Sequence, residues 1–355
     1  MNEHEVEMGF ASRVVAWQKR HGRHHLPWQN TQDPYRVWVS EVMLQQTQVV
    51  TVIDYFERFM ARFPDVTSLA EASLDDVLGL WSGLGYYSRA RNLHRCAQQI
   101  VAQFDGVFPP DAQTLESLAG IGRSTAAAIA SLCFGERVAI LDANVKRVLT
   151  RVLGFDADLA VSSHMNALWS AATELLPTEG AAAVAMPRYT QGLMDLGATV
   201  CFPKKPDCGR CPMQRDCVAQ AAGDPQRYPV RARKLKRSSQ SIWLLWAQTK
   251  DGAVLLARRP TPGVWAGLYC LPLFDSEEEL RAGLPASQQV HLRPQAAFLH
   301  VLTHKDLHLH PVRLEVAEQT LRWEAGQWVG AQIWPGLGLP APIRKLLQSV
   351  ALASI

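Results

Sequence analysis

A change in residue pattern near residue 223 divides this chain of 355 residues into two parts that fold by different rules. Before it, apolar side chains recur at the spacing of amphipathic helices, and glycines punctuate the pattern. In residues 33–63, Asp33 is expected to cap a helix that starts at Pro34, with breaks that divide the stretch into shorter helices. We therefore expect residues 1–222 to form an all-α domain.

The part from residue 241 to residue 355 has a different texture. Short, largely apolar runs are separated by turn residues, a pattern typical of strands. A small mixed α/β domain is therefore predicted. The expected strands are residues 241–248, 253–260 and 307–316, and the expected closing helix is 341–352.

Residues 223–240 join the two parts. They contain proline and serine, and six basic residues lie from Arg227 to Arg237 with no acidic residue among them. This composition indicates an exposed linker, which either is simply solvated or lies along a phosphate backbone.

The overall composition limits the classes of function. Apolar residues make up 48% of the chain, enough for packed cores, whereas a net charge of +3 does not by itself indicate a polyanionic partner. The sequence has no apolar run of membrane-spanning length, and its start lacks the pattern of a signal peptide. We expect a cytoplasmic protein, nucleoid-associated if the chain is bacterial, where structural disulfides are rare.

Four of the seven cysteines lie within seventeen positions, separated by six, two and five residues. A zinc site would more often show two Cys-x-x-Cys pairs, or cysteines paired with histidines, whereas this stretch has one pair and no histidine. One compact loop with four thiolates favours a [4Fe–4S] cluster over zinc. Cys96, Cys133 and Cys270 are expected to be core thiols. The clustered cysteines are Cys201, Cys208, Cys211 and Cys217.

A glycine turn precedes a candidate carboxylate. Gly120 and Gly122 flank Ile121 between two short predicted helices, which indicates either an ordinary turn or a hairpin whose backbone N–H groups approach an anion. Asp142 is expected at the N-terminus of the next helix, where backbone hydrogen bonds should keep it ionised. It is either a simple cap or a fixed anion that stabilises a cationic sugar.

These motifs resemble a known family. The cysteine spacing after "MDLGATVC" is similar to the cluster loop of the endonuclease III family of DNA repair glycosylases, and the glycine hairpin with Asp142 resembles the helix-hairpin-helix glycosylase superfamily. The stretches "LPWQ", "SEVMLQQTQV", "GLGYYSRARN" and "YTQGLMDLG" closely resemble the adenine DNA glycosylases, the MutY family, over residues 10–220. The resemblance implies one [4Fe–4S] cluster and basic loop residues that reach DNA, here Lys204, Lys205 and Arg210.

The resemblance also implies roles for individual residues. Glu41 would protonate adenine N7 and then help to activate water. Asp142 would stabilise the cationic sugar, either electrostatically or through a transient covalent adduct with it. The adenine pocket would contain Trp28, Gln29 and Gln191. The residues that contact DNA, or fill the stack once adenine is flipped out, would be Gln46, Thr47, Leu84, Tyr86, Gly120, Gly122, Ser124 and Lys146. Trp28 is equally compatible with a core aromatic.

Two departures from the family pattern affect the chemistry. Ser124 stands where bifunctional relatives have a nucleophilic lysine, so the sequence predicts hydrolysis without efficient strand cleavage, and Lys146 is more simply a phosphate contact than a substitute nucleophile. Ala143 follows Asp142 where the family pattern has glycine.

The C-terminal part resembles the family's second domain, which has the fold of the Nudix hydrolase MutT. The metal-binding Nudix box is absent, which favours a reader of 8-oxoguanine over a pyrophosphatase. In place of the family's Phe-Ser-His, the chain has Leu302, Thr303 and His304, which keep a hydroxyl and an imidazole but lose the aromatic wedge.

The expected partner is double-stranded DNA with adenine opposite 8-oxoguanine or guanine, bound by a monomer. Two alternatives stay open: a glycosylase for another mispaired base such as thymine, and a non-catalytic lesion-binding protein. The presence of both Glu41 and Asp142 argues against the second alternative.

Overall fold

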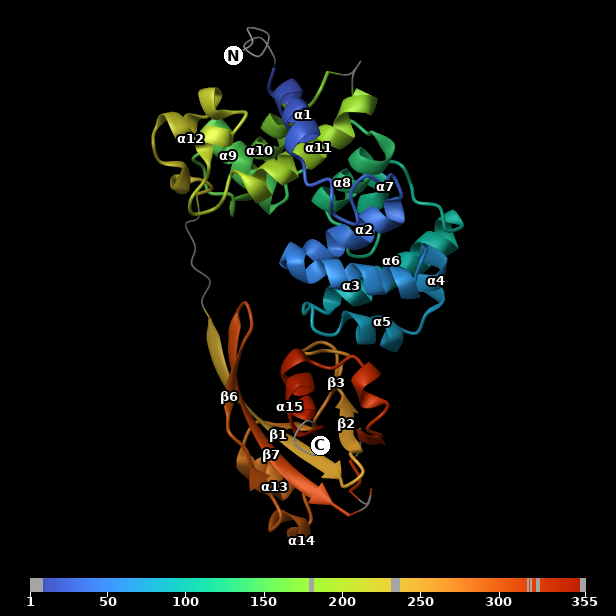
Figure 1. The fold of residues 1–355 in the computed structure, drawn as a ribbon. Helices are drawn as coiled ribbons and strands as arrows, with labels where there is room; N and C mark the ends of the chain where they lie inside the picture. The colour runs from blue at the N-terminus through green and yellow to red at the C-terminus, as the bar shows by residue number, and fades with distance from the viewer. Residues whose placement is uncertain are drawn as a thin grey trace. The chain divides into compact units, whose positions relative to one another are not determined.

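The computed structural model describes residues 9–178, 182–230, 237–317, 319, 321–323 and 326–351. The chain divides into two compact units. The first consists of residues 1–70 and 95–234, and the second of residues 71–94 and 235–355 (Figure 1). Residues 71–94 are thus helical, as the sequence predicts, but pack with the C-terminal unit.

The first unit is built from helices, and the helix N-terminus predicted at Asp33 and Pro34 is confirmed. Asp33 caps the helix that begins at Pro34, because its side chain accepts a hydrogen bond from the N–H of Tyr35 at 2.9 Å. The expected break divides residues 33–63 into two helices. The helices wholly in this unit are α1 (Phe10–His21), α2 (Pro34–Leu44), α3 (Val49–Arg62), α7 (Ala112–Glu116), α8 (Arg123–Phe134), α9 (Ala143–Leu153), α10 (Ser162–Glu174), α11 (Ala182–Thr199) and α12 (Val218–Ala221).

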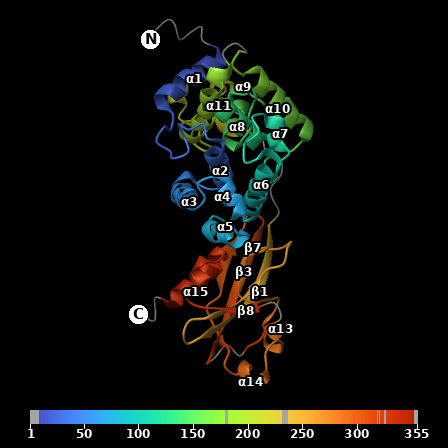
Figure 2. The ribbon, with the colours of Figure 1, turned by 90° about the vertical axis from the view of Figure 1, so that its right-hand side faces the viewer.

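Helix α11 organises the core of the first unit. It packs against α1, α8 and α9, as the views from two sides show (Figures 1 and 2). A glycine allows the close approach to α9, because a Cβ atom at Gly197 would lie 2.5 Å from the Cβ of Asn144. The apolar core between these helices includes Val14, Val148 and Leu193, all at most 2% exposed.

The second unit contains a mixed sheet with strand order β3-β2-β1-β7-β5, to which β4, β6 and β8 also pair. The two longest strands run parallel, with Ser238 of β1 opposite Lys305 of β7. Helices α13 and α15 lie on opposite faces of the sheet (Figure 2). The strands are β1 (Ser238–Thr249), β2 (Val254–Arg258), β3 (Tyr269–Cys270), β4 (Leu273–Phe274), β5 (Arg293–Pro294), β6 (Phe298–Val301), β7 (Lys305–Val316) and β8 (Gly326–Val329).

The helices of the second unit are α5 (Leu74–Trp81), α13 (Glu277–Ala282), α14 (Ala286–Gln289) and α15 (Ala341–Ala351). Two more helices, α4 (Val66–Glu71) and α6 (Ser88–Phe104), have residues in both units.

The expected strands and closing helix of this unit are confirmed. Residues 241–248 lie in β1, 307–316 lie in β7, and β2 occupies most of the third expected strand. One face of the sheet buries Leu245, Leu255 and Leu314 together with Leu280 of α13.

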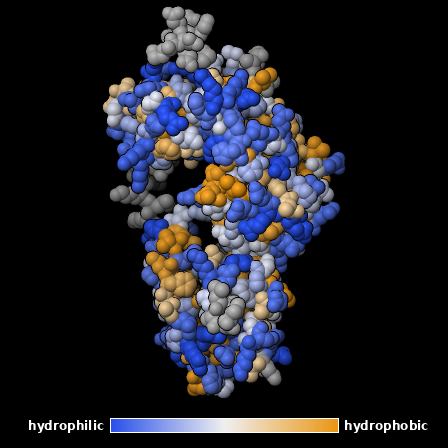
Figure 3. Space-filling model, viewed as in Figure 1, coloured by the Kyte–Doolittle hydropathy of each residue, from blue (hydrophilic) through white to orange (hydrophobic). Residues whose placement is uncertain are grey.

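Hydrophilic side chains cover most of the face seen in Figure 3, and hydrophobic ones gather in small patches. Within the described residues, no helix is both long enough and apolar enough to span a bilayer. Residues 231–236, the centre of the predicted linker, lie outside the described residues. At its edges, Arg227 forms an ion pair with Asp156 and Arg237 forms one with Asp306.

None of the seven cysteines forms a disulfide. Cys96 and Cys270 are fully buried, which confirms the prediction that they are core thiols, whereas Cys133 is only partly buried.

Candidate active site

Glu41 lies on α2 among residues that face the interior of the first unit. Its side chain is partly buried. Burial raises the pKa of Glu41 to about 7, the negative charge of Asp142 contributes to the rise, and Arg23 opposes it. A carboxyl group with this pKa is partly protonated at neutral pH and can therefore donate a proton.

Asp142 is the N-cap of α9, as predicted. Its Oδ1 accepts a hydrogen bond from the N–H of Val145 at 2.6 Å. Burial raises the pKa of Asp142 above its ordinary value. It outweighs the hydrogen bonds from Val145 and Asn144 and the charge of Arg147, which favour the ionised form, as expected. Folding thus brings the charge of Asp142 to bear on Glu41, which lies 101 residues earlier in the sequence.

Ala143, where the family pattern has glycine, fits its position. It begins α9 and is exposed. It is not among the residues with positive φ, so the backbone here does not require glycine. Lys146 follows on the same helix, and its N–H donates to the carbonyl of Asp142 at 2.9 Å.

The predicted hairpin connects α7 to α8. Gly120 has φ +76, a left-handed conformation that favours glycine, whereas Gly122 caps α8 with φ −91, which any residue can adopt. A Cβ atom at Gly122 would meet nothing within 4 Å, so the space beside it is open. Ser124 lies in the first turn of α8, and its hydroxyl accepts a hydrogen bond from the N–H of Leu141 at 3.0 Å.

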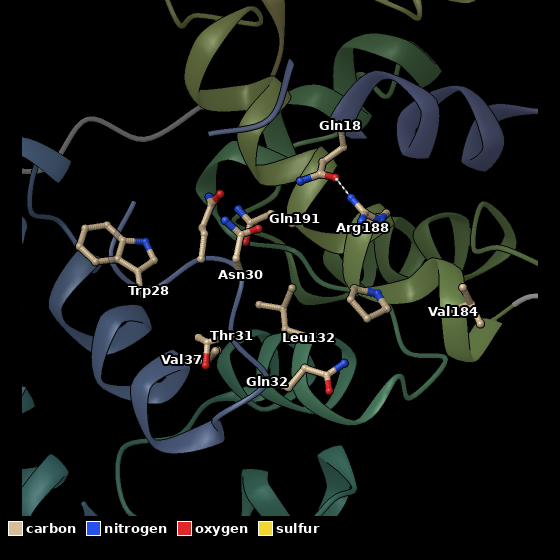
Figure 4. A pocket seen from close by; sticks show the side chains of 12 residues that line it. Gln18, Trp28, Asn30, Thr31, Gln32, Val37, Leu132, Val184, Arg188 and Gln191 are labelled. Carbon is tan, nitrogen blue, oxygen red and sulfur yellow. Dashed lines mark hydrogen bonds between the residues drawn. The ribbon is translucent and has the colours of Figure 1, made fainter. Parts of the chain in front are cut away.

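Trp28, Gln29 and Gln191, which the family resemblance assigns to one pocket, do line one cavity of about 770 Å³ (Figure 4). Trp28 is 7% exposed and packs edge to face against Phe56, so it is also a core aromatic. At another part of the wall, Arg188 Nη1 donates to Gln18 Oε1 at 3.3 Å, the bond drawn in Figure 4. Glu41 is not among the residues that line this cavity.

The sequence did not predict the role of Asp195, which orients the pocket amides, or of Arg23, which holds Asp195 in place. Asp195 is fully buried, and its Oδ1 accepts hydrogen bonds from Arg23 Nε at 2.7 Å and from Gln191 Nε2 at 3.0 Å. Gln29 Nε2 reaches the same oxygen at 3.4 Å, and the Arg23 N–H donates to Oδ2 at 3.0 Å. An acidic residue four positions after Gln191 on an apolar helix was the available signal.

The DNA-contact candidates occupy two units. Gln46 is exposed and Thr47 partly buried in the first unit, whereas Leu84 and Tyr86 belong to the second. Gln46 and Tyr86 have positive φ values of 57 and 49, the kind of strain that often marks functional positions. Leu84 is 6% exposed, so the structure does not present it as a free wedge.

Thr303 and His304 form the exposed turn between β6 and β7. The N–H of Leu302 donates to the carbonyl of Lys305 at 2.8 Å and closes this turn. Within the same unit, Tyr86 Oη lies 2.6 Å from Thr303 Oγ1, at hydrogen-bond distance.

The four clustered cysteines line one cavity together with apolar side chains and two charged ones, Arg151 and Asp207. Two short 3-10 turns, Cys208–Arg210 and Gln214–Asp216, shape the loop, and burial raises the pKa of Cys211 to about 12. Among the described residues, no group of three or more His, Cys, Asp or Glu side chains is arranged to hold a single metal ion. Convergence of four thiols on one cavity fits the donor set of an iron–sulfur cluster.

The basic residues of the cysteine loop lie on the surface. Lys204 and Lys205 are exposed, and Arg210 is 70% exposed and 3.7 Å from Asp207. They are therefore accessible to a partner.

Comparison with known proteins identifies the family. Residues 39–172 match the HhH-GPD superfamily of base excision DNA repair proteins, and residues 243–349 match the NUDIX domain. An adenine DNA glycosylase of Buchnera aphidicola subsp. Acyrthosiphon pisum is 34% identical over 346 residues, which cover 96% of this chain and 97% of that protein. The chain belongs to the adenine DNA glycosylase family.

Other similarities agree with membership in this family. A Mus musculus adenine DNA glycosylase is 44% identical over 220 residues, covering 59% of this chain and 41% of that protein. The solved structure of a thermostable thymine-DNA glycosylase is 27% identical with a TM-score of 0.52, covering 60% of this chain and 95% of that one. The expected fold class, a helix-hairpin-helix glycosylase core followed by a Nudix-like domain, is confirmed.

Proposed function

We propose that this adenine DNA glycosylase family member hydrolyses the N-glycosidic bond of adenine opposite 8-oxoguanine, and less efficiently opposite guanine, in double-stranded DNA. The observation that carries the proposal is the pairing of Glu41, with a pKa of about 7, and Asp142 at the N-terminus of α9. One carboxyl group of such a pair holds a proton at neutral pH while the other supplies an anion.

The two groups act in sequence. Glu41 transfers its proton to N7 of the flipped adenine, the bond between the sugar C1′ and N9 breaks, and the bonding electrons leave with the neutral base. Asp142 stabilises the positive charge that develops on the sugar. Water then adds to C1′ and returns a proton to the Glu41 carboxylate, which restores the enzyme.

The amides beside Asp195 are suited to an adenine base. Because Asp195 engages the N–H groups of Gln29 and Gln191, the Gln29 amide oxygen is turned away from it. That Oε1 atom is buried and has no hydrogen-bond partner among the described residues. It offers an acceptor for the exocyclic amino group of adenine, a group that thymine lacks.

Strand cleavage is not expected to accompany base release. A lyase needs an amine at the sugar, and Ser124 provides only a hydroxyl, which already accepts a hydrogen bond from Leu141. Lys146 is instead assigned to a DNA phosphate.

The second unit is proposed to read the base opposite adenine. Thr303 and His304 are exposed on a tight turn and bear a hydroxyl and an imidazole suited to hydrogen bonding with 8-oxoguanine. Leu302 supplies a smaller apolar surface than the aromatic residue of the family pattern.

The cofactor is proposed to be one [4Fe–4S] cluster held by Cys201, Cys208, Cys211 and Cys217. When bound, the cluster supplies a rigid cross-link of the loop rather than a reacting group. The loop then holds Lys204, Lys205 and Arg210 ready to contact the DNA backbone.

Single-turnover base release tests the function. Duplexes with adenine opposite 8-oxoguanine, adenine opposite guanine, and thymine opposite guanine are compared at one salt concentration, with and without alkali. Release of adenine, with strand breaks only after alkali, is the expected result. Preferential release of thymine, or binding without release, would replace the proposal by one of its two alternatives. Light scattering should give the mass of a monomer.

A further inference from the structure

Arg151 of α9 is a buried cation directed at the cysteine loop. It is 2% exposed, and its Nη1 donates to Cys201 Sγ at 3.3 Å and to the carbonyl of Phe202 at 2.7 Å. Its Nη2 donates to the carbonyl of Pro203 at 2.8 Å, and its Nε donates to that of Tyr228 at 3.3 Å. The fork therefore spans the start of the loop and the chain that follows it.

A second contact ties the same residue to another cysteine. Cys217 Sγ lies 3.4 Å from the carbonyl oxygen of Arg151, and Arg151 lines the cavity together with all four cysteines. The side chain thus contacts the first cysteine of the loop, and the backbone contacts the last.

The charge of Arg151 lacks a conventional partner. Within the described parts of the chain, no carboxylate forms an ion pair with it. Carbonyl oxygens satisfy its N–H groups but do not neutralise its charge, and a buried unpaired charge is costly. Asp207 also lines the cavity but lies 3.7 Å from Arg210, with which it forms an ion pair. The four cysteines that share the cavity with Arg151 can neutralise its charge once they bind a metal centre as thiolates.

We infer that Arg151 is the buried counter-charge and sulfur hydrogen-bond donor of the cluster, through which it raises the cluster's reduction potential and slows iron loss. This inference rests on the proposed [4Fe–4S] cofactor. Hydrogen bonds to sulfur and local net charge set the potential of such clusters. A cation favours the more negative, reduced state, so removing it should lower the midpoint potential and make the cluster easier to oxidise.

Three variants separate the effect of the charge of Arg151, the effect of its hydrogen bonds, and the effect of losing any basic residue near the cysteines. Arg151→Gln removes the charge but keeps a donor, whereas Arg151→Lys keeps the charge but loses the planar fork. Arg215→Met is the matched control, because it removes an equal charge between Cys211 and Cys217 at an exposed position. Each purified protein is assayed for iron, for its midpoint potential by spectroelectrochemical titration, and for its rate of iron loss to a chelator.

In Arg151→Gln, the midpoint potential of the cluster should be lower than that of the wild-type cluster by about 59 mV or more. For a one-electron couple this is a tenfold change in the ratio of oxidised to reduced cluster. Arg151→Lys should show a smaller shift together with faster iron loss, and Arg215→Met should match wild type in both measurements. If Arg151→Gln does not fold, iron loss from Arg151→Lys decides the matter.

Two results have different meanings. If both Arg151 variants have wild-type potential and iron retention, or if Arg215→Met shifts the potential equally, the inference is overturned while the cluster stands. If wild-type protein purified without oxygen holds no iron, the proposed cofactor itself is wrong. The wild-type glycosylase assay reports separately on the proposed reaction.

Discussion

The backbone N–H of Leu141 donates a 3.0 Å hydrogen bond to the hydroxyl of Ser124. This bond joins the first turn of α8, which follows the glycine hairpin, to the residue directly before Asp142. Leu141 is 2% exposed, so water cannot replace the acceptor easily. Ser124 therefore fixes the backbone beside a proposed catalytic carboxylate.

Ser124→Ala should lower both stability and the rate of base release, because the buried Leu141 N–H loses its acceptor at a cost of about 1–3 kcal/mol. Thermal unfolding and single-turnover kinetics measure the two effects. Ser124→Thr keeps the hydroxyl and should restore most of both. Ser117→Ala is the control, since the Ser117 hydroxyl is exposed and donates to a carbonyl in its own turn. If Ser124→Ala behaves like Ser117→Ala, the bond has no positioning role.

Glu41→Gln should abolish base release and spare mismatch binding, because an amide cannot deliver the proton that a carboxylic acid gives to N7. In the wild type, the rate of base release should fall as pH rises through about 7, since the acid form of Glu41 is then lost. Single-turnover rates between pH 5.5 and 8.5 on one duplex provide the test. A pH-independent rate over this range would assign the acid elsewhere.

The same substitution should change stability in a pH-dependent way. Above the unfolded-state pKa of Glu41, the folded protein holds a proton that the unfolded chain has released, so stability falls as pH rises towards the folded pKa of about 7. Glu41→Gln lacks this loss and should therefore be more stable than wild type at pH 8, with little difference at pH 4. Denaturant titrations at both pH values would show whether the difference in the free energy of unfolding appears at pH 8 and is absent at pH 4.

Asp142→Asn should keep the fold and cripple catalysis. Asparagine caps helices about as well as aspartate, so α9 should persist, but the anion beneath the developing cation is removed. Asp142→Ala should lose in addition about 1 kcal/mol of stability with the cap. Near-normal turnover in Asp142→Asn, with duplex affinity measured alongside, would contradict the electrostatic role.

Thr303→Ala and His304→Ala should weaken action on adenine opposite 8-oxoguanine more than on adenine opposite guanine. A good base contact is typically worth about 1–3 kcal/mol of discrimination. Tyr86→Phe removes the phenolic hydroxyl beside Thr303 and tests whether that contact supports the preference for 8-oxoguanine over guanine. Equal losses on the two duplexes in single-turnover assays would show that the turn contributes only general affinity. Full-length variants are preferable to truncation, because residues 71–94 pack with the C-terminal unit.

Cys208→Ser should lower folded yield, iron content and DNA affinity together, whereas wild type should contain about four irons per chain. Cys133→Ser is the control, since Cys133 lies outside the cysteine loop. Stoichiometric zinc without iron in protein purified anaerobically would restore the zinc alternative.

Local features of the fold could be predicted because local interactions cause them. Asp33 and Asp142 cap helices through hydrogen bonds to N–H groups two or three residues away, and helical or strand spacing follows from which face is buried. The spacing of the four cysteines likewise places them in one loop. These properties depend on neighbours in the chain, which the sequence displays directly.

The energetics of the site depended on tertiary structure. The pKa of Glu41 is set by burial and by Asp142, and Asp195 meets Arg23 from 172 residues away. Arg151 is an ordinary basic residue of an amphipathic helix until folding places it against Cys201. Composition and spacing carry no record of such contacts, because desolvation and long-range charge arise only when distant segments pack together. The sequence thus determined the helices, the strands and the cysteine loop, and packing decided which charges those elements bury.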